Sequence, residues 1–401
     1  MKIFNGILRN QTRMRKGRSL MRCKARHGSN TGIYTASTKR DSSLRLRFPA
    51  VAVQALLVLV ALQFPVTGHC DSGSGWFKNL FESKGKNMKE VATKVATLHE
   101  DNEIWGLDFS PDGKHLAATS PNTKKVHVWD WRNGKRTAQS LEKEGSDLTT
   151  TEPLRYSPDG RLLVWCGGTI ARIWNTDTWE VVHTIDGTAG VEAAGGGCNA
   201  IGFTPDGKSL ILVLYRVPNH PGDNLIIYST STWQSVWGLR TVPFQPNSLV
   251  VSPDGKFVAL GGQVLSGFDK PNPIQIDIVD MTQRAIVRTI QNKGGRIAWS
   301  PDGAYIASGW GGGVEIFDAH SGEKVAEEKT GGGHPFVRYT PDGKYLISGS
   351  EGTDAIIKIW DARHHTLLQV IPGEARGLAV SPDGHYLAIG GFRDIQVWEL
   401  K

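Results

Sequence analysis

The sequence predicts an all-β protein, a seven-bladed β-propeller of four-stranded antiparallel blades. The first observation is a four-residue turn, Ser/Thr-Pro-Asp-Gly, that occurs seven times in the 401 residues. The second is its spacing: successive turn prolines are 47, 47, 48, 48, 40 and 41 residues apart, and repeats of this length are typical of propeller blades. The third is the apolar alternation that flanks each turn, as in β-strands. The turns are residues 110–113, 157–160, 204–207, 252–255, 300–303, 340–343 and 381–384.

The turn sequence itself favours a hairpin. Proline presets the backbone dihedral of the second turn position, aspartate can bond to its own backbone, and glycine accepts a positive φ. Each copy is therefore expected to join the first and second strands of a blade.

Each repeat has room for four strands. Leu107 and Phe109 show the period-two spacing of a first strand, and residues 115–118 follow the turn as a second strand. Fourth strands are expected at segments such as 181–185, 285–290 and 366–370. Third strands are expected at 126–130, 171–175, 225–229, 276–280, 314–318, 357–361 and 395–399.

The two ends of the repeat region are expected to share one blade. The last repeat stops at Lys401, after its third strand, which would leave an exposed sheet edge. Residues 94–98 resemble the other fourth strands and would fill this place. The region 94–401 then holds 308 residues, or 44 for each of seven blades.

Residues 94–401 resemble the WD-repeat family of β-propellers. Trp129-Asp130 and Trp360-Asp361 match the family dipeptide, whereas the Gly-His pair that usually opens a repeat is missing and Leu98-His99 is its nearest counterpart. Degenerate dipeptides are Trp174-Asn175, Tyr228-Ser229, Val279-Asp280, Phe317-Asp318 and Trp398-Glu399. The resemblance implies a non-enzymatic scaffold that binds a protein partner or an envelope component, without a cofactor.

Charge is distributed unevenly along the chain. Residues 1–47 hold 13 Lys and Arg against one acid, whereas residues 69–401 hold 33 basic and 38 acidic side chains. The repeat region is therefore acidic overall, which argues against a nucleic-acid partner. We expect a monomer.

An uncharged apolar stretch at 48–68 follows the basic leader and is typical of an export signal. Val66-Thr67-Gly68 offers small residues for cleavage. We therefore expect a leader and signal at 1–68, a linker at 69–93 and the propeller at 94–401, in a periplasmic or extracellular protein. The alternative is a membrane anchor retained at 48–66.

The linker and the cysteines give two further predictions. Trp76, Phe77, Leu80 and Phe81 have helical spacing and predict a short amphipathic helix in the linker. Cys166 and Cys198 are expected at one end of adjacent blades. An oxidising compartment would permit a disulfide between them, and the alternative is two buried free thiols.

The end of the propeller opposite the seven turns is the candidate binding surface, because its connections vary in length. The residue six places before each turn proline is expected to face solvent around the channel: Trp105, Glu152, Asn199, Asn247, Gly295, Pro335 and Arg376. The long loops add Tyr215, Arg216, His220, Phe268, Asp269 and Lys270.

An alternative function is an envelope enzyme, such as a lactonase or hydrolase, at the channel mouth. Glu152 and His220 would be its acid–base pair. The sequence has no phosphate loop, haem motif, paired-cysteine zinc spacing or calcium loop. Glu152 is also the only acid in the ring, which favours binding over metal-assisted hydrolysis.

Overall fold

The computed structural model describes residues 21–27, 30–36, 89–121, 123, 125–142, 154–168, 170–186, 197–214, 223–241, 244–264, 273–291, 294–330, 333, 335–352 and 355–401. The chain divides into two units, Met1–Asn87 and Met88–Lys401. In the first unit β1 (Met21–His27) pairs antiparallel with β2 (Asn30–Ala36). The predicted signal at 48–68 and the predicted helix that carries Trp76 and Phe81 lie outside the described residues.

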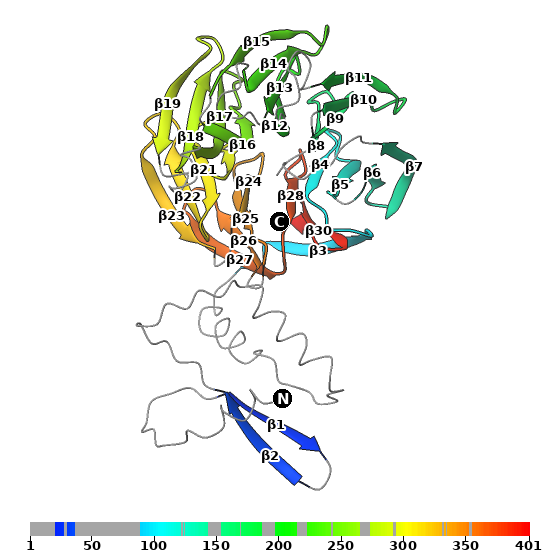
Figure 1. Cartoon of the computed structure of the whole chain (residues 1–401), viewed down its shortest axis with the longest axis vertical. Coiled ribbons are helices and arrows are strands. Elements are labelled where there is room, and N and C mark those ends of the chain that lie inside the picture. The colour runs from blue at the N-terminus through cyan, green and yellow to red at the C-terminus, as the bar shows by residue number, and fades with distance from the viewer. Residues whose placement is uncertain are drawn as a thin grey trace, which may run out of the picture. The chain divides into compact units, whose positions relative to one another are not determined.

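The second unit consists of seven four-stranded antiparallel sheets, which confirms the prediction of an all-β seven-bladed propeller. Figure 1 shows the sheets arranged around a common centre, with the first strand of each sheet innermost. Blade 1 is β4 (Gly106–Phe109), β5 (His115–Thr119), β6 (Lys125–Asp130) and β7 (Lys135–Glu142). Blade 2 is β8 (Leu154–Tyr156), β9 (Leu162–Gly167), β10 (Ile170–Asn175) and β11 (Val181–Asp186). Blade 3 is β12 (Cys198–Phe203), β13 (Ser209–Leu214), β14 (Leu225–Ser229) and β15 (Ser235–Leu239).

The remaining blades repeat this order. Blade 4 is β16 (Phe244–Val251), β17 (Phe257–Val264), β18 (Ile274–Asp280) and β19 (Ala285–Gln291). Blade 5 is β20 (Arg296–Trp299), β21 (Tyr305–Trp310), β22 (Gly313–Asp318) and β23 (Lys324–Lys329). Blade 6 is β24 (Phe336–Tyr339), β25 (Tyr345–Gly349), β26 (Ile356–Asp361) and β27 (Thr366–Pro372). Blade 7 is β28 (Gly377–Val380), β29 (Tyr386–Gly390), β30 (Asp394–Leu400) and β3 (Ala92–His99).

Blade 7 combines the two ends of the repeat region. β3 pairs antiparallel with β30, from Ala92 opposite Leu400 to His99 opposite Asp394. Gln369 of blade 6 reinforces the junction, since its Oε1 accepts the N–H groups of Val91 and Ala92, both at 2.7 Å. The ring of blades is therefore closed by hydrogen bonds between segments nearly 300 residues apart.

The seven turns share one hydrogen-bond pattern. In blade 1 Ser110 Oγ donates to Asp112 Oδ1 at 2.6 Å, and the same carboxylate oxygen accepts Lys114 N–H at 3.0 Å. His115 N–H donates to Ser110 Oγ at 2.9 Å, which fixes the start of the second strand. Gly113 has φ 68°, so the glycine is required by the backbone conformation.

The turns also contact one another around the ring. A Cβ placed on Gly255 would lie 3.2 Å from Pro205 Cδ, which belongs to the turn of the preceding blade. Gly160 faces Pro111 in the same way, at 3.5 Å. Each tetrapeptide therefore reverses its own hairpin, and five of the seven also lie with their glycine against the turn proline of the preceding blade: those of Gly160, Gly207, Gly255, Gly343 and Gly384.

Buried apolar side chains fill the spaces between neighbouring blades. The tryptophans of the repeat dipeptides belong to this packing, since Trp129, Trp174 and Trp360 have exposed fractions of 6%, 2% and 3%. Trp165 and Trp174 lie in the cluster between blades 1 and 2 and are among the largest fully buried side chains. Truncating such a tryptophan to alanine costs about 3–5 kcal/mol, so blade contacts dominate the stability of the propeller.

We predict that the turn aspartates make stability depend on acid pH. The Ser252 hydroxyl lowers the pKa of Asp254; partial burial opposes this and the Lys256 N–H adds to it. The pKa is also lowered at Asp112, Asp159, Asp206, Asp302, Asp342 and Asp383. A lowered pKa stabilises the fold above the unfolded-state pKa of 3.8, and this contribution disappears as pH falls through the folded-state value.

Urea unfolding at pH 5 and at pH 3 measures this effect. Asp254→Asn should reduce the loss of stability between the two pH values, whereas Asp101→Asn, at an exposed residue outside the turns, should leave it unchanged. Equal losses in the parent and in Asp254→Asn would contradict the prediction.

Candidate functional site

The two ends of the propeller differ in their connections. One end carries the seven short turns, and the opposite end carries the loops between second and third strands and those between blades. Seven predicted site residues in the long loops lie outside the described residues: Glu152, Tyr215, Arg216, His220, Phe268, Asp269 and Lys270. The other four, Trp105, Asn199, Asn247 and Arg376, are described and stand at or near the starts of inner strands.

The ring of residues at the channel mouth is less exposed than the sequence predicts. Asn199 is 5% exposed and Gly295 and Pro335 are buried, so the expectation that these three face solvent is wrong. The physical reason is the close approach of inner strands. Asn199 Nδ2 donates to Pro246 O at 3.0 Å in the next blade, and a Cβ on Gly309 would lie 2.0 Å from Pro335 O. Trp105, Asn247 and Arg376 are half-buried.

At least three polar atoms of this ring are buried without a hydrogen-bond partner within the described part of the chain. They include the indole Nε1 of Trp105, the amide Oδ1 of Asn199 and the guanidinium Nε of Arg376. Buried polar atoms in native proteins are normally paired with protein, water or a ligand. The mouth therefore retains unused hydrogen-bonding capacity.

Arg376 is held rigidly between two carboxylates. Its guanidinium bonds to Glu103 and, at 2.8 Å, to Glu374 Oε1. The same guanidinium lies 5.7 Å from the ring centre of Phe392, and Arg393 lies 5.8 Å from that ring. Phe392 is 58% exposed, so an aromatic ring flanked by two cations faces solvent at this end.

Trp310 is a second exposed aromatic residue at this end. It is 37% exposed, and a Cβ on Gly295 would lie 2.8 Å from its ring. Neither Trp310 nor Phe392 was predicted as a site residue, because Trp310 ends β21 and Phe392 follows β29 at places where the connections are short. Their signal is the adjacent glycines, Gly311 and Gly391, which mark tight turns that project the neighbouring side chain.

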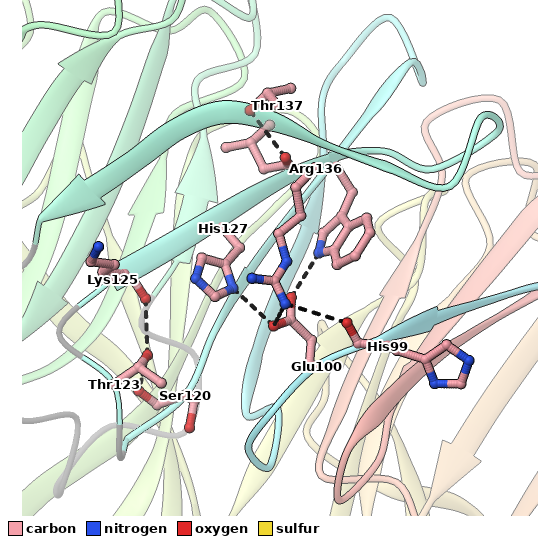
Figure 2. A network of polar contacts seen from close by, with 10 residues as sticks. His99, Glu100, Ser120, Thr123, Lys125, His127, Arg136 and Thr137 are labelled. Carbon is pink, nitrogen blue, oxygen red and sulfur yellow. Dashed lines mark hydrogen bonds and ion pairs between the residues drawn. The ribbon is translucent and has the colours of Figure 1, made fainter.

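A buried network anchors the segment between β3 and β4, which carries Glu103 and Trp105. Figure 2 shows Glu100 at its centre, with the side chains of His127 and Arg136 directed toward it. Glu100 Oε1 accepts the Trp129 indole N–H at 2.7 Å, and Oε2 lies 2.8 Å from His127 Nδ1 and 3.1 Å from Arg136 Nη2. The Glu100 side chain is only 3% exposed. The closing blade is thereby tied to blade 1.

The inner strands also line a central cavity of about 370 Å³ toward the turn end. Its charged residues lie three places before the turn prolines. Asp108 Oδ2 accepts Tyr156 N–H at 2.7 Å, and the Arg155 and Arg338 guanidiniums donate to the carbonyls of Leu154 and Val337 at 2.9 and 2.8 Å. Burial raises the pKa of Tyr156.

Cys166 and Cys198 are joined by a disulfide, with their Cα atoms 5.6 Å apart. Both are buried, and the bond connects the second strand of blade 2 to the first strand of blade 3.

No group of three or more His, Cys, Asp or Glu residues in the described ranges is arranged to hold a metal ion. Within the same ranges, no helix has the length and apolarity that crossing a bilayer requires. Glu152 and His220, the predicted acid–base pair of the enzyme alternative, lie outside the described residues.

Comparison with known proteins places this geometry among repeat propellers. The family model described as WD domain, G-beta repeat, matches residues 92–130 and 330–361. SEC12-like protein 2 of Arabidopsis thaliana is 24% identical over 270 residues, which cover 66% of this chain and 61% of that protein. Eukaryotic translation initiation factor 3 subunit I of Lodderomyces elongisporus is 26% identical over 277 residues, which cover 62% and 73%.

Other matches extend beyond this chain. Protein tipD of Dictyostelium discoideum is 25% identical over 287 residues, which cover 62% of this chain but only 44% of that protein. The chain thus spans less than two thirds of SEC12-like protein 2 and of tipD. Kuenenia stuttgartiensis hydrazine synthase has a chain that aligns with a TM-score of 0.61 at 19% identity, covering 75% of this chain and 96% of that one. That likeness shows the fold alone.

We predict that Glu100→Ala destabilises the propeller. The change leaves the Trp129 indole N–H without its acceptor and removes the anion between His127 and Arg136. The free energy of unfolding should fall by about 3 kcal/mol. Asp101→Ala, at the exposed neighbouring acid, should change it by less than about 0.5 kcal/mol. Equal stabilities of the two variants in urea unfolding would refute a structural role for the network.

Proposed function

We propose that this chain, a WD-repeat β-propeller, is a non-enzymatic scaffold that binds a protein partner or an envelope component through the end opposite its seven turns. WD-repeat propellers generally bind protein partners. The observation that carries the proposal is the combination of exposed Phe392 with the fixed Arg376 guanidinium beside it.

The chemistry of this end suits protein binding. Aromatic and arginine side chains are enriched at the centres of protein interfaces, where they contribute most of the binding energy. Arg376 is held by Glu103 and Glu374 before any partner arrives, so little side-chain entropy is lost on binding. Half-buried Trp105 adds a further aromatic side chain at the same mouth.

We further propose that the protein is exported to the periplasm or the extracellular space. The apolar stretch at 48–68 supports this proposal, and so does the Cys166–Cys198 disulfide, because disulfides persist mainly in oxidising compartments.

Affinity capture from an envelope extract tests the scaffold function. Phe392→Ala with Arg393→Ala should reduce recovery of a bound partner about tenfold, as expected for interface hot spots. Arg216→Ala with Phe268→Ala tests the predicted loops in the same assay. Lys208→Ala, whose side chain is 82% exposed at the turn end, is the matched control. Equal recovery by all variants would contradict the assignment of the surface.

N-terminal sequencing of the exported protein and thiol titration test the export proposal. We expect a mature chain that begins close to residue 69 and has one free thiol, Cys70, when unfolded without reductant. Cys166→Ser should raise the count to two by releasing Cys198. A mature chain that begins before residue 48 would contradict cleavage.

A further inference from the structure

A groove at the turn end separates blades 1 and 2. It encloses about 260 Å³ and is lined by Asp112 and His115 from blade 1 and by Tyr156, Asp159, Asp177 and Trp179 from blade 2. It lies at the end of the propeller opposite the surface proposed above, so it is a separate site.

The charge of the groove is strongly negative. Three carboxylates line it, and no lysine or arginine does. Lys114 and Arg161 stand at its edge, 3.4 Å from Asp112 and 4.0 Å from Asp159, but their side chains are 73% and 80% exposed. Such exposed pairs contribute little, so a better-placed cation would displace them easily. Hydrogen bonds in the turns hold the pKa of Asp112 and of Asp159 low against the opposing effect of partial burial, which keeps both charged at neutral pH.

Tyr156 adds an unused polar group to this groove. The residue is 7% exposed, and its hydroxyl is buried without a hydrogen-bond partner in the described part of the chain. The groove between blades 4 and 5 differs in the hydrogen bonding of its aromatic residue. There Trp299, at the equivalent place before the turn, donates its Nε1–H to Gly303 O at 3.0 Å. The indole N–H of Trp299 thus has a hydrogen-bond partner, whereas the hydroxyl of Tyr156 has none within the described residues.

Two other blade junctions hold one of the molecule's own arginines. Between blades 4 and 5, Arg288 lines a hollow of similar size, about 260 Å³, and donates to Ala319 O at 3.1 Å. Between blades 7 and 1, the Arg132 guanidinium lies 4.2 Å from the ring centre of Trp131 and donates to Gly113 O at 2.7 Å. The groove between blades 1 and 2 has the aromatic residue, Trp179, and the acids, but no arginine lining it.

We propose that this groove binds the guanidinium of an arginine side chain from a protein partner. A planar guanidinium can stack on an indole while it donates to carboxylates in its own plane, which an ammonium cannot do. The Tyr156 hydroxyl would gain a hydrogen-bond partner in the same step. The acids in the described ranges form no metal-binding group, so an organic cation fits the groove better than a metal ion does.

Titration of the full-length chain with a short peptide, acetyl-Gly-Arg-Gly-amide, tests this proposal by NMR of ¹⁵N-labelled tryptophan indoles. Trp179→Phe assigns the signal in the groove. We expect the Trp179 indole to shift with saturation, and the citrulline analogue, which is neutral and of the same shape, to bind at least about tenfold more weakly.

Two substitutions and two matched controls locate the site. Asp177→Asn and Tyr156→Phe should each weaken peptide binding about fivefold. Glu180→Gln, at an exposed acid of the same turn, and Tyr339→Phe, at the equivalent tyrosine of blade 6, should leave it unchanged. Tyr156→Phe removes a buried, unpartnered hydroxyl, so the variant should remain folded.

Equal binding of the arginine and citrulline peptides would overturn the proposal, and so would unchanged affinity in Asp177→Asn. Neither result would bear on the opposite end, because none of the substitutions that test that end in the capture experiment lies in this groove.

Discussion

Closure of the ring is the constraint on which the rest of the structure depends. Because β3 pairs with β30, the third strand of blade 7 is not left with an open edge. The same pairing carries the chain directly from β3 into the segment that holds Glu100, Glu103 and Trp105. Glu100 then binds blade 1, and Glu103 binds Arg376 of the connection before β28. One backbone pairing thus positions both the buried network and the fixed arginine of the proposed docking surface.

The seven similar turns distinguish one end of the molecule from the other. At the turn end every hairpin is fixed by the same hydrogen bonds between a serine or threonine and an aspartate, and in five of the seven turns the glycine lies against the proline of the preceding turn. The opposite end is free of this requirement and carries the connections of variable length. The turn end is nevertheless not uniform, because the spaces between blades are filled by different side chains. Arg288 and Arg132 lie at two of these junctions, whereas no lysine or arginine lines the groove beside Trp179.

The sequence was sufficient to predict the strands and the number of blades, since these follow from local periodicity and from the repeat. It did not predict the burial of Asn199, Gly295 and Pro335, because that depends on the distance between inner strands of different blades. Phe392 and Glu100 were missed for a related reason. Their roles depend on Arg376 and Trp129, partners from other segments that no local pattern identifies. The groove at Trp179 likewise combines residues from three separate turns.

The most direct measurement of closure is calorimetric unfolding of the full-length chain with a proline in the pairing strand. Val397 is fully buried in β30 and paired on both sides, so Val397→Pro should abolish the single cooperative transition. Val95→Pro is the matched control, because Val95 is 46% exposed at the bulge of the outer strand β3, where proline is tolerated. Closure of the ring through β3 and β30 predicts a cooperative transition for Val95→Pro and none for Val397→Pro. A Val397→Pro variant that unfolds cooperatively at the parent temperature would contradict it.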